Sequence, residues 1–312
     1  MARAGPVTGD FTGDRRYLGQ VQFAQAVTGM MNVPGTGQIW YVDKNKTSGT
    51  TGDGKTWLRA FLTVTEGIAA LSNYDVLMIA PGNYDEDNTL SLSGLYGVKI
   101  LGFANGMNWG EGSTCIRDVT STDDILDIDG CRSIEISGIS FINSGAYDAI
   151  NIGATTGCYS IHIHHCAFTG DTGGGATGLY GVYMHSGKAP DTYIHDCKFF
   201  HYATVGIDMM VNNQRGVVHD CFFIVSNGGI GINVTPMTSS YHGIWRCNFL
   251  GAIGDNGDQG IDVGDVSLPG RLMVADCIFA GCVMTGGGTD AEIGCVKNYA
   301  SSATGGAIED PT

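Results

Sequence analysis

Apolar and polar residues alternate in short segments over most of the chain, and the same pattern returns many times. Alternation with a period of two is typical of a β-strand that is buried on one face. In most copies the segment ends just before a Cys-x-Phe triplet, and an earlier copy at 139–141 has Ile in place of Cys. The triplets are at residues 166–168, 197–199, 221–223, 247–249 and 277–279.

A second alternating segment separates each copy from the next, and no segment between them has the length of a helix. These second segments are at residues 125–128, 149–152, 181–184, 206–209, 230–234 and 260–263. From Phe141 to Phe279 the repeated Phe recurs after 27, 31, 24, 26 and 30 residues. The repeat predicts a solenoid in which each strand pairs in parallel with its copy one coil away, at ~4.8 Å.

The residues before the repeat have a different pattern. Segments 38–43 and 74–79 alternate as strands do, and segment 59–71 between them has the apolar spacing of a helix. The apolar face of this helix would consist of Ala60, Val64, Ile68 and Leu71. We expect the helix to cover the end of the solenoid, where the core and unpaired strand edges would otherwise be exposed.

The repeated coil resembles the right-handed parallel β-helix of pectate-lyase-like proteins, whose coils carry the pattern I-x-I-x-[N/D]-C-x-F. The sequence P-G-N-Y at 81–84 is similar to the opening of such proteins. The resemblance implies an all-β fold, a right-handed parallel β-helix solenoid of about seven coils. We divide the chain into an extended N-terminal arm at 1–36, an N-terminal cap with a capping helix at 37–95, the parallel β-helix at 96–298 and a C-terminal tail at 299–312.

Composition and charge exclude several classes of protein. The chain has 49 Gly among its 312 residues, and 31 acidic against 16 basic side chains give a net charge of −15. This charge argues against a nucleic-acid partner, which is bound through clustered Lys and Arg. No apolar run approaches the ~20 residues of a membrane span, so we expect no membrane partner. No apolar signal-peptide core is found before residue 36, which favours synthesis without export.

The repeated Cys and His residues invite a metal site. The five Cys of the triplets would form one inward column of buried thiols, and no C-x-x-C pair is present. If Ile163, Ile194 and Val218 point inward, then His164, His195 and His219 form an outward ladder over three coils. Three His could bind a metal, but a solvated or interfacial ladder is the interpretation we favour. We therefore expect no metal and no cofactor.

An outward face of the coils becomes more apolar toward the C-terminus. The apolar residues on it are Val217, Phe222, Trp245, Met273 and Ile278. With the His ladder, they would form an interface to another chain, because an outward apolar patch is typical of such surfaces. A loop of this chain folding over the patch is the alternative.

The carboxylates of the second segments are the candidates for catalysis. Asp127, Asn151, Tyr183, Asp208, Asn233 and Asp262 occupy the same outward position. Asp208 and Asp262 are two coils apart, ~10 Å on the inter-strand spacing, which a glycosidase pair could use. A polar ladder on a wetted face explains them equally well, and we expect no catalytic residues. Tyr183 could also take part in glycan binding without cleavage.

The arm and the short β-helix together resemble bacteriophage virion proteins, which are capsid decoration or cement proteins and small tail spikes. This resemblance implies a structural virion protein that assembles in the host cytoplasm as a homotrimer. Its arm, with Arg3, Arg15 and Arg16, would attach to the capsid or another virion protein. The alternative is a tail spike that binds or depolymerises host polysaccharide as a lyase or glycoside hydrolase.

Overall fold

The computed structural model describes residues 37–301 apart from short segments. Outside the described residues lie 1–36, 48, 87–88, 104–111, 119–122, 144–146, 171–178, 186–187, 201, 203, 210–214, 226–227, 235–240, 252–257, 264–270, 287–291, 297–298 and 302–312. The arm, with Arg3, Arg15 and Arg16, therefore lies outside the described residues, as does most of the C-terminal tail.

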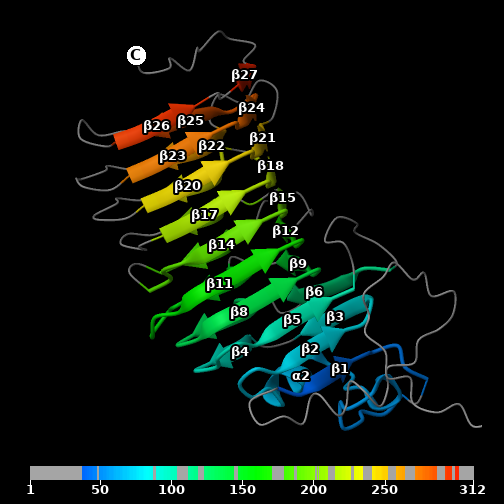
Figure 1. Cartoon of the computed structure of the whole chain (residues 1–312). Helices are drawn as coiled ribbons and strands as arrows, with labels where there is room; N and C mark the ends of the chain where they lie inside the picture. Colours follow the sequence, from blue (N-terminus) through cyan, green and yellow to red (C-terminus); the bar gives the residue numbers. More distant parts are fainter. Residues whose placement is uncertain are drawn as a thin grey trace, which may run out of the picture. The chain divides into compact units, whose positions relative to one another are not determined.

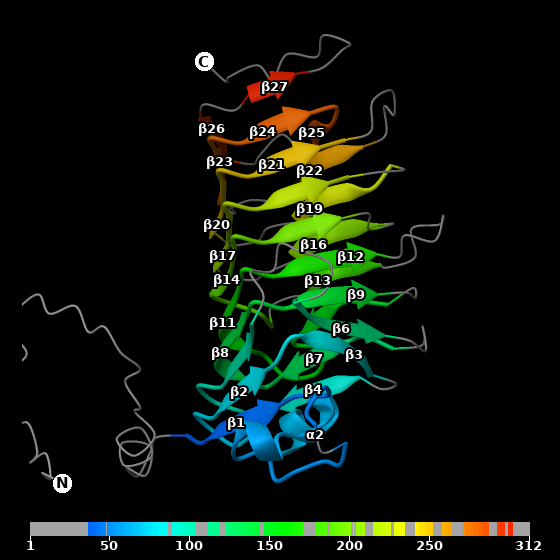
Figure 2. The ribbon, with the colours of Figure 1, turned by 90° about the vertical axis from the view of Figure 1, so that its right-hand side faces the viewer.

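Three parallel sheets form the body of the protein (Figures 1 and 2). Sheet A consists of β1 (Ile39–Val42), β2 (Val76–Ile79), β5 (Lys99–Gly102), β8 (Arg132–Ser137), β11 (Tyr159–His164), β14 (Thr192–His195), β17 (Arg215–His219), β20 (Tyr241–Trp245), β23 (Arg271–Ala275) and β26 (Glu292–Val296). Sheet B consists of β3 (Gly82–Glu86), β6 (Thr114–Asp118), β9 (Ser140–Asn143), β12 (Ala167–Gly170), β15 (Lys198–Phe200), β18 (Phe222–Ile224), β21 (Asn248–Leu250), β24 (Ile278–Ala280) and β27 (Tyr299–Ser301).

Sheet C consists of β4 (Leu90–Ser93), β7 (Leu126–Asp129), β10 (Ile150–Ile152), β13 (Tyr180–Met184), β16 (Val205–Met209), β19 (Ile230–Val234), β22 (Gln259–Val263) and β25 (Val283–Gly286). From β2 onward the chain passes through sheets A, B and C in turn, and every strand pairs with its equivalent one coil away. Each sheet is therefore a stack of equivalent strands, as Figure 1 shows for sheet A. The predicted all-β parallel solenoid is confirmed.

A sharp corner separates sheet A from sheet B in each coil. At this corner His165, Asp196, Asp220, Arg246 and Asp276 all have φ between 52° and 55°. Asp and Asn tolerate this left-handed conformation better than most residues. It shifts the alternation of inward and outward side chains, so that the Cys after the corner points inward. The Cys-x-Phe triplet therefore leads into sheet B, whereas the alternating segment before it belongs to sheet A.

Columns of identical residues fill the interior. The rings of Phe141, Phe168, Phe199, Phe223, Phe249 and Phe279 stack with centroids 4.6–5.3 Å apart. All six are fully buried. Their rings leave no room for side chains on the facing positions of sheet C, where glycines recur. A Cβ at Gly231, for example, would lie 2.8 Å from the Phe249 ring.

Phe103 does not belong to this column. It is exposed and packs edge-on against Trp57, with ring centroids 5.5 Å apart. The column begins instead with Tyr84 and Ile116, which the strand register places under Phe141. The Cys of the triplets are buried free thiols, in agreement with the sequence.

The N-terminal helix is shorter than predicted. A 3₁₀ turn, η1 (Trp57–Arg59), precedes helix α2 (Val64–Ala69), so segment 59–71 is not one helix. Thr63 begins α2 because its hydroxyl accepts the Glu66 backbone N–H while the Glu66 carboxylate accepts the Thr63 backbone N–H. The four residues of the predicted apolar face are all buried, but only Val64 and Ile68 belong to α2.

Helix α2 packs at one end of the stack, beside β1 (Figure 2). Gly67 lies against Val42 and Leu77, so close that a Cβ there would collide with both side chains. The strands of segment 37–95 belong to the same three sheets as the later coils and share their hydrophobic core. Neither described helix is long and apolar enough to cross a membrane.

Candidate functional site

The outward side of sheet C carries one continuous column of polar side chains. The strand register aligns Ser91, Asp127, Asn151, Tyr183, Asp208, Asn233 and Asp262. The six residues predicted to share this position therefore do share it. Asp208 and Asp262 lie two coils apart with Asn233 between them, as the sequence predicted.

A second group of side chains stands at the beginning of the same strands. Asp124 lies three residues before Asp127, Asp148 three before Asn151, and Tyr180 three before Tyr183. In β13, Gly181 and Val182 are both buried, so the strand turns enough to put Tyr180 and Tyr183 on one side. Sequence reasoning missed Asp124 and Asp148; the available signal was a polar residue three positions before Asp127, Asn151 and Tyr183.

The carboxyl groups of this face are unusually buried. Burial, and then the charge of Asp124, raise the pKa of the Asp148 carboxyl to about 8. The same two causes raise the pKa of Asp127 to about 6. Burial raises the pKa of Asp208 to about 6, although the hydrogen bond that Asn233 Nδ2 donates at 3.1 Å opposes this effect. At neutral pH the face therefore presents both protonated and ionised carboxyls.

Hydrogen bonds hold part of this group and leave part of it unsatisfied. The Asn151 Nδ2 donates to Asp124 Oδ2 at 2.8 Å, and the Asp148 backbone N–H donates to Asp124 Oδ1 at 2.7 Å. One oxygen each of Asp127, Asp148 and Asn151 is buried without a hydrogen-bond partner. Because buried polar atoms are normally paired, such a cluster is a candidate for recognition or catalysis.

Aromatic rings stand beside these carboxyls. The Tyr180 and Tyr183 rings stack at 4.8 Å, and His185 meets Tyr183 edge-on at 4.5 Å. All three are half-buried. Burial and the charge of Asp208 raise the pKa of both tyrosines, so their hydroxyls remain protonated donors. Neutral hydroxyl donors, carboxyls and aromatic surface together form a site suited to a polyhydroxylated ligand.

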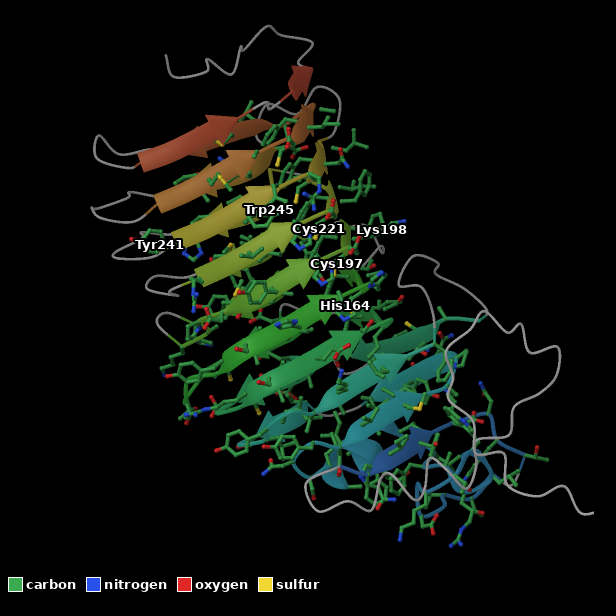
Figure 3. The ribbon with its side chains drawn as sticks, viewed as in Figure 1. His164, Cys197, Lys198, Cys221, Tyr241 and Trp245 are labelled. Carbon is green, nitrogen blue, oxygen red and sulfur yellow. The ribbon has the colours of Figure 1, made fainter. Side chains whose placement is uncertain are left out.

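Sheet A carries the predicted His ladder. The His164, His195 and His219 rings are parallel within 2° and stack at 4.9 Å, and Trp245 continues the stack at 5.5 Å (Figure 3). Stacked rings direct their nitrogens side by side rather than toward one point. Acidic neighbours engage these nitrogens: Glu135 at His164, Asp196 at His195 and Asp220 at His219. This is the geometry of a ladder, and it does not assemble three nitrogens around a metal.

The predicted apolar interface residues do not lie on one sheet. Val217, Trp245 and Met273 are on sheet A, whereas Phe222 and Ile278 are on sheet B, beyond the left-handed corner. In Figure 3, Trp245 lies on sheet A and Lys198 beyond the corner. The Trp245 ring lies over Gly243 and is half-buried. Met273 and Ile278, 49% and 46% exposed, are the members that project into solvent.

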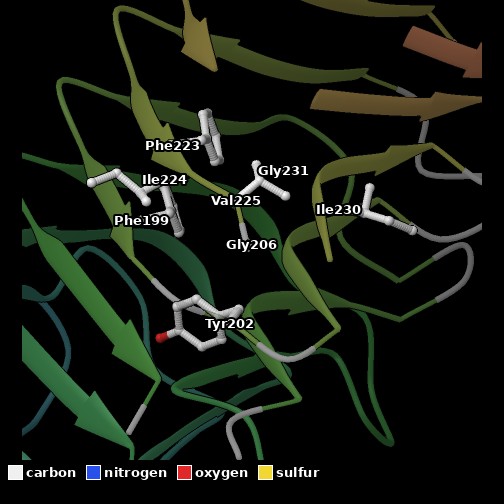
Figure 4. Close-up of a pocket in the computed structure, with 8 residues that line it drawn as sticks. All are labelled: Phe199, Tyr202, Gly206, Phe223, Ile224, Val225, Ile230 and Gly231. Carbon is white, nitrogen blue, oxygen red and sulfur yellow. The ribbon is translucent and has the colours of Figure 1, made fainter. Parts of the chain in front are cut away.

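Described residues line a small cavity and an open hollow. A cavity of about 10 Å³ lies between Phe199, Tyr202 and Phe223, where the chain passes from sheet B to sheet C (Figure 4). It is about the size of one water molecule and too small for a ligand. An open hollow of about 420 Å³ lies near the cap, against Asp43, Lys46, Thr47, Trp57 and Leu58.

Comparison with known proteins gives structural similarity alone. No protein-family model matches the sequence, and no curated protein matches it. The chain is similar to the pectin methylesterase of Aspergillus niger, with 14% identity and a TM-score of 0.50 over 89% of this chain and 88% of that one. It is similar to a pectate lyase of Xanthomonas campestris, with 13% identity and a TM-score of 0.50 over 85% and 84%.

A tailspike protein of E. coli bacteriophage HK620, solved with a pentasaccharide, has 12% identity and a TM-score of 0.47 over 91% of this chain and 60% of that one. At such identities the similarities concern the fold. The protein is an all-β parallel β-solenoid whose fold matches that of pectate-lyase-like β-helices. Function has to be argued from its own residues.

Proposed function

We propose that this protein binds polysaccharide on the outward face of sheet C. The observation that carries the proposal is the group of buried carboxyls with raised pKa beside the stacked Tyr180 and Tyr183 rings. Sugar rings pack on aromatic side chains, and their hydroxyls hydrogen-bond to carboxyl and amide groups. The face has the residue types for both interactions on adjacent strands, within reach of one oligosaccharide.

A glycan array with the full-length protein tests this function. We expect Tyr183→Ala and Asp208→Asn to weaken binding at least tenfold, the loss of one or two hydrogen bonds or an aromatic contact. Tyr193→Ala is the matched control, because Tyr193 is a half-buried tyrosine on sheet A and should leave binding unchanged. Equal losses from Tyr183→Ala and Tyr193→Ala, or no binding to any glycan, would contradict the proposal.

Cleavage of the bound glycan is an extension of the same proposal. A glycosidase uses one protonated and one ionised carboxyl. Asp148 would serve as the protonated acid and Asp208, two coils away, as the ionised partner, whose charge contributes to the raised pKa of Asp148. Asp262, the other residue named from sequence, would then bind substrate. New reducing ends that disappear in Asp148→Asn would support cleavage, whereas binding without product would restrict the protein to recognition.

A second candidate is a structural role in a virion, as a trimeric capsid decoration or cement protein attached through residues 1–36. The exposure of Met273 and Ile278 at the C-terminal coils favours it, because such residues pack against other chains. Light scattering should show a trimer that Met273→Asp with Ile278→Asp dissociates. Leu58→Asp, at an exposed leucine of the cap, is the control. A monomer at high concentration would contradict this role.

A further inference from the structure

A row of exposed tyrosines and one arginine runs along the edge where the chain passes from sheet C to sheet A. Tyr96 pairs with Arg132, and Arg132 with Tyr159, in the parallel register of three consecutive coils. Tyr96 and Tyr159 are 42% and 45% exposed. Tyr74 extends the row by one coil, since its backbone N–H donates to the Tyr96 carbonyl at 2.7 Å.

Arg132 lies between the two tyrosines. Its guanidinium carbon is 5.1 Å from the Tyr159 ring centroid and 6.0 Å from that of Tyr96. Contacts on both sides hold the guanidinium by cation–π attraction and restrict its rotation. A guanidinium fixed in this way is prepared for a bidentate ligand at little further cost in side-chain entropy.

No ion pair joins Arg132 to any carboxylate in the part of the chain that the structure describes. Among the arginine side chains that the structure describes, four each pair with an aspartate: Arg59 with Asp53, Arg117 with Asp85, Arg215 with Asp191 and Arg246 with Asp220. Arg132 is the exception, in a chain with 31 acidic side chains. Asp129, the acid of the same turn, instead accepts the backbone N–H groups of Thr155 and Thr156.

We propose that this Tyr–Arg–Tyr edge (Tyr96, Arg132 and Tyr159) binds the carboxylate of an acidic polysaccharide. The planar guanidinium suits a carboxylate, and the flanking phenol hydroxyls suit the hydroxyls beside it on a sugar acid. Rungs ~4.8 Å apart offer a linear polymer a repeated contact over successive coils. Arg132 follows β7 in the chain, so a polymer leaving sheet C around this corner meets the edge directly. The site is separate from the one proposed on sheet C.

Binding of polygalacturonate and of its carboxyl-reduced, neutral form to the full-length protein tests the proposal by calorimetry. We expect polygalacturonate to bind and the reduced polymer to bind at least tenfold more weakly, as the loss of a charge-assisted hydrogen-bond pair requires. Arg132→Gln should remove this difference, and Arg132→Lys should restore only part of it. Arg117→Gln, which removes the same charge from a paired arginine, is the control and should retain wild-type affinity.

Several outcomes would overturn the proposal. They are equal binding of the two polymers, equal losses in Arg132→Gln and Arg117→Gln, or no binding of polygalacturonate to the wild type. A change of oligomeric state in Arg132→Gln by sedimentation would also overturn it, because the edge would then be a protein contact. Because Asp208→Asn acts on sheet C, its effect on neutral glycans separates failure of that site from failure of this one.

Discussion

Single residues of this protein are specialised by the coil position that they occupy. The same residue type serves different purposes on different sides of a corner: Asp220 tolerates a left-handed backbone, whereas Asp148 is a buried acid at the start of a sheet C strand. The salt bridge from Arg246 and the hydrogen bond from His219 hold the pKa of Asp220 at about 2. Burial has the opposite effect on Asp148. Local environment, rather than residue type, therefore sets the charge on each carboxyl.

The raised pKa of Asp148 predicts a specific pH dependence of stability. The folded state binds this proton more tightly than the unfolded chain, whose carboxyl has a pKa of ~3.9. Its stabilising contribution is therefore complete below pH ~4 and is lost as the pH rises toward about 8. Between pH 6.5 and 7.5, the free energy of unfolding should fall by about 1 kcal/mol from this group.

Urea unfolding of wild type and Asp148→Asn at several pH values measures this slope. The variant should lack it, because an amide does not titrate. Asp208→Asn is the control, since the pKa of Asp208 is about 6 and its effect should lie mainly below that pH. The same slope in Asp148→Asn as in wild type would show that another group is responsible.

Elements of the solenoid are held by columns that cross the sheets. The Phe column of sheet B and the Gly positions of sheet C depend on each other, because the rings occupy the volume that side chains would need. The sequence revealed the Phe column, since the Phe recurs with the coil period, but not that the glycines of sheet C lie against it. It did not reveal that the triplets form a separate sheet, although the inward residues on either side of the corner, such as Ile194 and Cys197, are three positions apart rather than two.

Truncation of one ring in the Phe column should be costly. Phe223 is fully buried and stacks on Phe199 and Phe249 at 4.8 Å on both sides. We expect Phe223→Ala to lower the free energy of unfolding by about 3–5 kcal/mol, the usual cost of a large buried cavity. Denaturant unfolding measures this. A loss below about 1 kcal/mol would mean that the coils collapse into the space.

Overfilling the same layer should also destabilise the protein. An added methyl at Gly231 would meet the Gly260 carbonyl at 2.6 Å and the Phe249 ring at 2.8 Å, so Gly231→Ala should cost about 1–3 kcal/mol. Gly157→Ala is the control, because a methyl added there would have its nearest neighbouring atom at 3.7 Å, an ordinary contact. Equal effects of the two substitutions would refute the packing argument.

The molecule as a whole is a stack in which each coil contacts its two neighbours. Stability in such an arrangement is approximately a sum of coil and interface contributions, so coils near an end open more readily than central ones. The architecture was readable from sequence because the repeat is strong. Of the sheet C group, the sequence predicted the aligned column but not the raised pKa values, since these depend on burial by several coils. The Arg132 edge was not readable, because its residues recur in no column.

Thiol labelling should report this graded stability. The described Cys are all buried, and burial raises the pKa of the thiols of Cys197 and Cys221 well above their usual value. The native protein should therefore react slowly with iodoacetamide. At low denaturant we expect Cys282, which lies just before the terminal sheet C strand β25, to be labelled before Cys197. Peptide mass spectrometry measures the order, and simultaneous labelling would indicate a single cooperative unit.

The left-handed corner before each Cys also has a consequence for how such a gene can change in length. The corner recurs at the same position in every coil. Removal of residues 222–247 would therefore join Cys221 to Asn248, and Asn248 would take the strand position of Phe222. Every remaining Phe, Gly and Cys would meet an equivalent neighbour, and the molecule would shorten by one strand spacing of ~4.8 Å. Recombination between neighbouring coils could thus adjust the reach of the protein in uniform steps while leaving its cross-section unchanged.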